Sequence, residues 1–408
     1  MKQYLKAASF IVLILFSGSL QALDFGLLLD QNVDSIVYGN EWRSDTINYS
    51  GTLIPRVSAL LGDNMEFVFS AGLAYQIRPW VGVPEFLWPE LLRTEMTLSY
   101  GMSEFKVGRM PYRDPLGIIA EGLFDGVQFS YDTRMGTLSA GGWYTGFLYK
   151  WRASIDMTDD ETRRYDDDLD YGKFLDTYFA PRRILSLLGW EHPAAGGLFD
   201  VKVAALGQFD LAKTKKLNSQ YLAAKIAMPF RYFIVDLGGC FELMEYDDDW
   251  EMAMAAEAGF TLMLPTRLEN HFTLRGRYTS GAVEDGHLNA FKPLTTVAQG
   301  NLLKVKISGL SIMSLGYHSR LHRVLSTELI ASYFVRSDKD TYTDYPVKGT
   351  DSGGYFLGPE FFLRVLWNIS TGIQMDFGGG VFLPSLGDAA HDEIMLWRAE
   401  LNMVISIL

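Results

Sequence analysis

Charged residues recur at even spacings within apolar stretches of this chain, and on a β-strand such residues share one face. Arg275 and Arg277 show this spacing, as do Glu360 and Arg364. A guanidinium stays charged at physiological pH, and charged side chains that project into water select the ions that pass. The chemistry indicated is the lining of a water-filled passage. Its candidate residues are Arg93, Glu95, Arg275, Arg277, Glu360, Arg364, Arg398 and Glu400.

The elements that would position these side chains are short strands, because apolar and polar residues alternate along most of the chain. HFTLRGRYTS at 271–280 and RAELNMVISIL at 398–408 are examples. The stretch EMAMAAEAGFTLML at 251–264 contains helix-favouring Ala and Met, but its place between an acidic loop and a proline turn favours a strand. The candidate strands are 24–36, 48–61, 65–77, 90–100, 104–112, 123–132, 136–149, 182–192, 197–211, 220–228, 231–245, 251–263, 269–280, 304–320, 324–336, 353–367, 369–383 and 392–408.

The connections between these strands differ in length according to strand parity. Tight turns follow even-numbered strands, at 62–64, 101–103, 133–135, 193–196, 264–267, 322–323 and 368. Longer connections follow odd-numbered strands, at 78–89, 150–181, 281–303, 337–352 and 384–391. This pattern predicts an all-β fold: one antiparallel up-and-down β-barrel of about 18 strands, with 16 as the alternative, crossing a membrane. A charge on the lipid face costs about 2–4 kcal/mol at mid-bilayer, so the charged face must line the lumen.

The N-terminal sequence predicts export. Lys2 and Lys6 precede the apolar run FIVLILF, which is followed by small and polar residues. This is the pattern of a secretory signal peptide over 1–22, with cleavage after Ala22 and one barrel over 23–408. The run is too short to span a bilayer, which needs about 20 apolar residues. The expected location is the outer membrane of a double-membraned bacterium, with its lipids and its barrel-assembly machinery as partners.

Composition excludes several classes of function. The net charge of −13 argues against a nucleic-acid partner, and one cysteine, Cys240, excludes an intramolecular disulfide framework. We expect Cys240 to be a small packed residue of a strand. The acidic loop 150–181 has three possible roles: an inward constriction, a divalent-cation site at the DDD of 166–168, or a solvated surface loop. The spacing of a calcium loop is not met.

Catalysis is not expected either. Outer-membrane barrel lipases and deacylases pair a His with a Ser two residues later on one strand face, and none of the six histidines begins a His-x-Ser sequence. His271-x-Thr273 is the nearest approximation. The sequence also has no phosphate loop and no metal-ligand spacing, so neither a cofactor nor a metal is predicted.

The stretch from Phe105 to Asp132 resembles a recurring element of porin-like outer-membrane barrels of the alginate-export type. In that element a Val-Gly-Arg strand end is followed by a loop and a Phe-Asp-Gly-Val strand. The matching residues are Val107, Gly108, Arg109, Phe124, Asp125, Gly126 and Val127. The resemblance implies an outer-membrane barrel of about 18 strands that passes a polar solute. Arg109 shares strand parity with apolar Phe105 and Val107, which requires a β-bulge or a location at the barrel rim.

The function predicted from these features is passive diffusion of small hydrophilic solutes through a mixed-charge channel. One alternative is a surface-exposed barrel whose extracellular loops bind a ligand or act as an adhesin. The other is export of an anionic polysaccharide. An exporter of a polyanion would need a strongly cationic lumen, whereas the predicted lumen carries both signs of charge. The sequence predicts neither the solute nor the oligomeric state.

Overall fold

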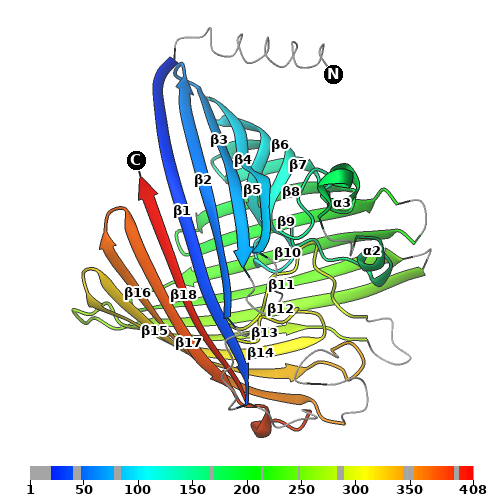
Figure 1. Cartoon of the computed structure of the whole chain (residues 1–408), viewed down its shortest axis with the longest axis vertical. Coiled ribbons are helices and arrows are strands. Elements are labelled where there is room, and N and C mark those ends of the chain that lie inside the picture. The colour runs from blue at the N-terminus through cyan, green and yellow to red at the C-terminus, as the bar shows by residue number, and fades with distance from the viewer. Residues whose placement is uncertain are drawn as a thin grey trace.

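The protein forms a closed antiparallel β-barrel of 18 strands (Figure 1). In this computed structural model the described residues are 20–39, 47–77, 84–165, 169–212, 215–246, 249–282, 289–342, 347, 353–389 and 395–407. Each strand pairs with its neighbour in sequence, and β1 pairs with β18 to close the sheet. The predicted fold class and strand number are therefore confirmed.

The strands are long enough to be tilted across a barrel wall. They are β1 (Leu20–Tyr38), β2 (Ile47–Leu61), β3 (Met65–Ile77), β4 (Pro84–Tyr100), β5 (Ser103–Arg113), β6 (Glu121–Thr133), β7 (Gly136–Tyr144), β8 (Arg183–Ala195), β9 (Phe199–Asp210), β10 (Leu217–Pro229), β11 (Phe233–Tyr246), β12 (Asp249–Met263), β13 (His271–Thr279), β14 (Leu310–His322), β15 (Leu325–Arg336), β16 (Phe356–Ser370), β17 (Ile373–Phe382) and β18 (Leu396–Ile407).

Alternation along these strands separates an apolar outer face from a mixed inner face. On β12, Ala253, Ala255 and Glu257 are buried while Ala256 and Ala258 between and after them are exposed. The segment 251–263 is therefore a strand, because its alternating faces fit a wall and its ladder is paired on both sides. The exposed outer face carries large apolar side chains, among them Leu188, Leu222, Phe241 and Met313.

The two ends of the barrel differ as the sequence predicts. The turns after even-numbered strands are short and form what we call the short-turn end. The opposite, long-loop end carries the extended connections, although 247–248 between β11 and β12 is a two-residue exception. Two predicted strands were too long: 145–149 and 304–309 lie in loops, because both segments leave the wall and contact other loops.

Short helices lie only at the long-loop end of the described part of the chain. They are α2 (Asp159–Tyr165), η2 (Tyr171–Lys173) and α3 (Phe174–Thr177) in the β7–β8 connection, and η3 (Pro384–Leu386) after β17. No helix among the described residues is long and apolar enough to span a bilayer. The acidic run 166–168 lies outside the described residues.

Candidate functional site: the charged lumen

Three segments of the long-loop end fold into the barrel, and we call 114–120, 145–165 and 289–309 the inner loops. The position of 289–309 follows from its contacts around the ring. Thr295 Oγ1 accepts a hydrogen bond from the Glu121 amide of β6 at 2.8 Å, and the Asn301 amide donates to Glu360 of β16 at 2.7 Å. These strands lie on opposite sides of the closed sheet. A segment that contacts both must cross the barrel from one side to the other.

The inner loops are also bonded to one another. The Leu294 and Thr295 amides donate to the Ile119 carbonyl at 2.7 and 3.1 Å. Ile155 and Thr295 form an antiparallel bridge, which joins loop 145–165 to loop 289–309. Because their backbone groups are paired with each other, the three loops form one layer that narrows the lumen.

The loop 114–120 is organised by a single carboxylate. Asp114 Oδ1 accepts from the Leu116 and Gly117 amides, and Oδ2 accepts from the Ile119 and Ala120 amides, at 2.8–3.0 Å. Four backbone donors are thereby satisfied away from water, which an unpaired loop of this kind could not achieve. Sequence reasoning missed this residue, although an Asp that precedes a Pro-Leu-Gly turn is a recognisable loop signal.

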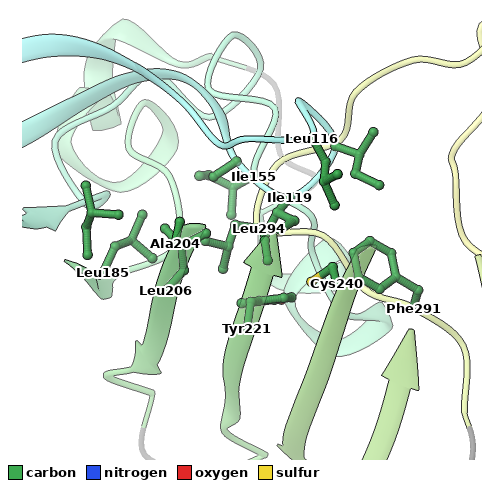
Figure 2. Close-up of a cluster of buried hydrophobic side chains, with 14 of the residues drawn as sticks. Leu116, Ile119, Ile155, Leu185, Ala204, Leu206, Tyr221, Cys240, Phe291 and Leu294 are labelled. Carbon is green, nitrogen blue, oxygen red and sulfur yellow. The ribbon is translucent and has the colours of Figure 1, made fainter. Parts of the chain in front are cut away.

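An apolar cluster fixes the inner loops against the wall (Figure 2). Leu116, Ile119, Ile155, Phe291 and Leu294 from the loops pack against side chains of β8–β11. The wall contributes Leu185, Ala204, Leu206, Tyr221 and Cys240. Cys240 is buried in this cluster as a small packed residue. The long-loop half of the lumen is thus partly filled by a core.

Glu360 acts as an anchor for this layer. Its side chain is fully buried, at 0 % exposure. Its carboxylate accepts hydrogen bonds from the Asn301, Leu302 and Leu303 amides at 2.7, 3.2 and 3.2 Å. Glu360 thus lies on the inner face and holds an inner loop rather than standing free in the lumen.

Arg277 belongs to a charge network next to the same loop. Its Nη2 donates to Glu257 Oε2 at 2.9 Å, and its Nη1 donates to Gln299 Oε1 at 2.6 Å. Lys225 Nζ binds the other oxygen of Glu257 at 2.5 Å. Glu257 of β12 therefore pairs with two cations, Arg277 of the adjacent strand β13 and Lys225 of β10. Arg275 lies two residues before Arg277 on β13, nearer the short-turn end. It is exposed and forms no ion pair with any described residue.

Arg93 and Glu95 of β4 pair with each other, Nε to Oε2, at 2.8 Å. Glu95 also accepts from Thr97 at 3.1 Å and is almost fully buried. Together with Lys106 of β5 the two residues line a cavity of about 200 Å³, to which Tyr112 and Leu187 also contribute. The predicted pair is thus brought together at one side of the lumen.

The remaining predicted residues form pairs on β16–β18. Arg364 binds Asp376 of β17 through Nε at 2.7 and 2.9 Å and also through Nη2. Arg398 Nε lies 3.2 Å from Glu400 Oε2, and its Nη2 lies 3.6 Å from Asp34 of β1. Glu400 also faces Lys304 of an inner loop at 3.5 Å. The eight predicted residues therefore do not form one ring of free charge, because all but Arg275 are held by an ion pair or by backbone hydrogen bonds.

The residues of the family resemblance take a different position. Arg109 and Asp125 lie opposite each other on the face of Val107 and Val127, which is the outer face. Arg109 is 4 % exposed, donates to Asp125 at 2.9 and 2.6 Å, and also binds the Leu91 and Phe147 carbonyls. The pairing of β5 with β6 runs through Arg109 without a register shift, and the pairing of β5 with β4 ends at Arg109. Of the two expectations, the rim location applies and not a bulge.

The other residues of that motif serve packing. Phe124 points inward into the apolar cluster, and Gly108 has φ of +119°. A Cβ atom at Gly108 would meet the Thr94 carbonyl of β4, so glycine is required there by both conformation and space. A Cβ at Gly126 would meet the backbone of β7.

The acidic loop forms a folded lobe at the long-loop end. Glu161 of α2 pairs with Arg183 at 2.5 Å, and both side chains are buried. Asp160 binds Lys215 at 2.6 Å and accepts from the Tyr246 hydroxyl at 3.2 Å; the Lys215 ammonium holds the pKa of this carboxyl below its usual value. Burial raises the pKa of Tyr178 to about 12. A cavity of about 460 Å³ lies beside α2, lined in part by Arg163, Lys215 and Lys292.

Comparison with solved structures identifies the fold of the chain. No family model and no curated protein matches the sequence. Among solved structures, Pseudomonas aeruginosa OccK2 (OpdF) is similar at 12% identity over 96% of this chain and 100% of its own, with a TM-score of 0.63. Acinetobacter baumannii OccAB1 is similar at 10% identity over 96% and 98%, with a TM-score of 0.63. Another structure of OccK2 holds glucuronate, at 11% identity and a TM-score of 0.62 over 96% and 98%. The chain thus has a porin-like barrel fold, and these comparisons do not support the alginate-export type that the stretch 105–132 resembles.

Proposed function

We propose that the protein is an outer-membrane channel for passive diffusion of small hydrophilic solutes. The observation that carries this proposal is the layer of inner loops inside a closed barrel with charged inner walls. A barrel of 16–18 strands leaves an aqueous channel unless something fills it. Here the inner loops narrow the passage at one level, which favours small solutes over polymers.

The identity of the solute is proposed from charge. Arg275 is the exposed cation on the inner face of β13, while neighbouring Arg277 is balanced by Glu257. The similarity to a barrel solved with glucuronate is in keeping with a small anionic solute. Export of an anionic polysaccharide, the other alternative from the sequence, fits less well, because the lumen pairs its cations with carboxylates. An adhesin would need loops directed outward, whereas three long-loop segments fold inward.

The test is conductance of the purified chain in a planar bilayer. Stable, ohmic unit steps are expected. Correctly inserted barrels that remain silent would contradict the proposal.

Measurements of ion selectivity then distinguish the roles of Arg275 and Arg277. Arg275→Gln should shift the reversal potential in a salt gradient toward cations, because it removes a charge that no described carboxylate balances. Arg277→Gln should shift it less and destabilise the Glu257 network instead, because the charge it removes is already paired. Equal shifts in both variants would refute this division.

The location and processing of the chain complete the proposal. The apolar outer face is typical of a lipid-facing wall, and the N-terminal sequence predicts cleavage after Ala22. Strand β1 begins at Leu20, so cleavage after Ala22 would remove the first three residues of this strand. Mass spectrometry of the protein from the outer-membrane fraction should show Leu23 as the first residue. An intact N-terminus would argue against a cleaved signal peptide.

A further inference from the structure

Two histidines face each other across neighbouring strands near the short-turn end. His271 begins β13, and the pairing register places it directly opposite His318 of β14. Their imidazole rings have centroids 4.6 Å apart and an angle of 21° between planes. Neither the proposed channel nor the paired charges of the lumen explain this contact.

Both rings belong to the inner face. His271 shares parity with Arg277, whose guanidinium reaches Gln299 of an inner loop. The intervening Phe272 and Leu274 are exposed on the outer face. Because residues directly opposite in an antiparallel pair share a face, His318 also points into the lumen. Both side chains are only partly buried, so solutes in the lumen can reach them.

The same rung continues with two further groups that suit a metal ion. Met263 of β12 lies opposite His271, and Glu328 of β15 lies opposite His318. The rung therefore places a thioether, two imidazoles and a carboxylate on four successive strands. Imidazole suits Cu, Zn and Ni, and a nearby carboxylate favours a cation.

The spacing of the rings matches chelation of one ion. With metal–nitrogen bonds near 2.05 Å, two imidazoles at ligand angles between 90° and 109° have centroids about 4.5–5.2 Å apart. The observed separation is 4.6 Å. The rings are stacked, so one must rotate about χ2 to point its nitrogen at the shared position. That torsion is broad and the rotation is inexpensive.

We propose that His271 and His318 form a two-imidazole site for a divalent transition-metal ion in the lumen, with water completing the coordination. No group of three or more His, Cys, Asp or Glu among the described residues is arranged to hold a metal ion. The two imidazoles are therefore the only ligands of these four types that we propose for the site. Cu²⁺ is the ion that such a nitrogen pair binds most strongly in the first-row series. This inference goes beyond the proposed channel function and does not depend on it.

The test is a titration of the full chain, folded in detergent, with Cu²⁺ alone at neutral pH, followed by electron paramagnetic resonance. The wild type should give one bound ion with a two-nitrogen superhyperfine pattern. His271→Gln and His318→Gln should each weaken binding by more than about tenfold and lose that pattern. His322→Gln is the matched control, because His322 lies on the same strand but outside the rung and is exposed.

His271 and His318 are each also replaced by Asn, and circular dichroism with protease resistance identifies the folded variants. If one substitution prevents folding, the other still tests the same position. Unchanged Cu²⁺ spectra in folded His271 and His318 variants would overturn the proposal, as would a wild type without nitrogen-coordinated Cu²⁺. A barrel that binds Cu²⁺ but does not conduct would refute the channel and leave the metal site standing.

Discussion

Replacing Glu360 by alanine should open the inner loop 289–309 locally while the barrel stays folded. The carboxylate is fully buried and accepts from the amides of 301–303. Its removal leaves three donors without a partner, and each such loss costs about 1–3 kcal/mol. We use about 3 kcal/mol for the three together, since lumen water will satisfy opened amides in part.

This magnitude sets the expected readout. About 1.4 kcal/mol corresponds to a tenfold change in an equilibrium, so the opened population of the loop should rise about 100-fold. Hydrogen–deuterium exchange with mass spectrometry reads this as a similar loss of protection in peptides that contain 301–303. Peptides of the wall strands should keep their protection, because their ladders are untouched.

The matched control is Glu104→Gln. Glu104 is exposed and pairs with Lys106 at 2.9 Å, and an exposed pair of this kind contributes at most about 1 kcal/mol. Exchange at 301–303 should not change in this variant. If Glu360→Ala folds and the protection of 301–303 also stays unchanged, the carboxylate is not the anchor that the structure indicates.

Two further predictions concern the wall and helix α2. Gly108→Ala should lower the yield of folded barrel, because a Cβ atom at φ +119° would meet the Thr94 carbonyl. Gly276→Ala is the control and should fold normally, because no atom lies near its Cβ position. Equal resistance of the two variants to heat and protease would contradict this prediction. The pKa of Asp160 is lowered by Lys215, so their link is present above the unfolded pKa and is lost as pH falls through the lower folded pKa. Exchange protection of α2 should therefore be constant from neutral pH to about pH 4 and fall only below it, and a loss near neutral pH would refute the assignment.

The wall could be predicted from sequence because its signal is local. Alternation is read from neighbouring residues, and loop length is the number of residues between two predicted strands. The sequence therefore predicts all 18 strands, with small errors at their ends. The errors at 145–149 and 304–309 have one cause. Both segments are apolar enough to resemble a strand, yet their apolar side chains pack inside the barrel with the inner loops.

The partners of the charged residues could not be predicted, because they depend on register between strands far apart in sequence. The sequence placed Arg364 on the inner face, but only the pairing shows Asp376 beside it. Arg109 shows the converse limit. Its parity with Phe105 and Val107 predicted a bulge or a rim location, but the carbonyls of Leu91 and Phe147 that bind its guanidinium come from another strand and a loop and could not be predicted.

The acidic side chains of the lumen divide into two groups that composition cannot separate. Glu257 and Asp376 balance cations, whereas Asp114 and Glu360 accept from backbone amides of the inner loops. Amides replace water around a buried carboxylate, so the second group lowers the cost of its own burial while it fixes a loop. Because every residue type except proline supplies a backbone N–H, no sequence pattern identifies this group. The mixed charge of the sequence therefore reflects in part how the inner loops are fixed in the barrel.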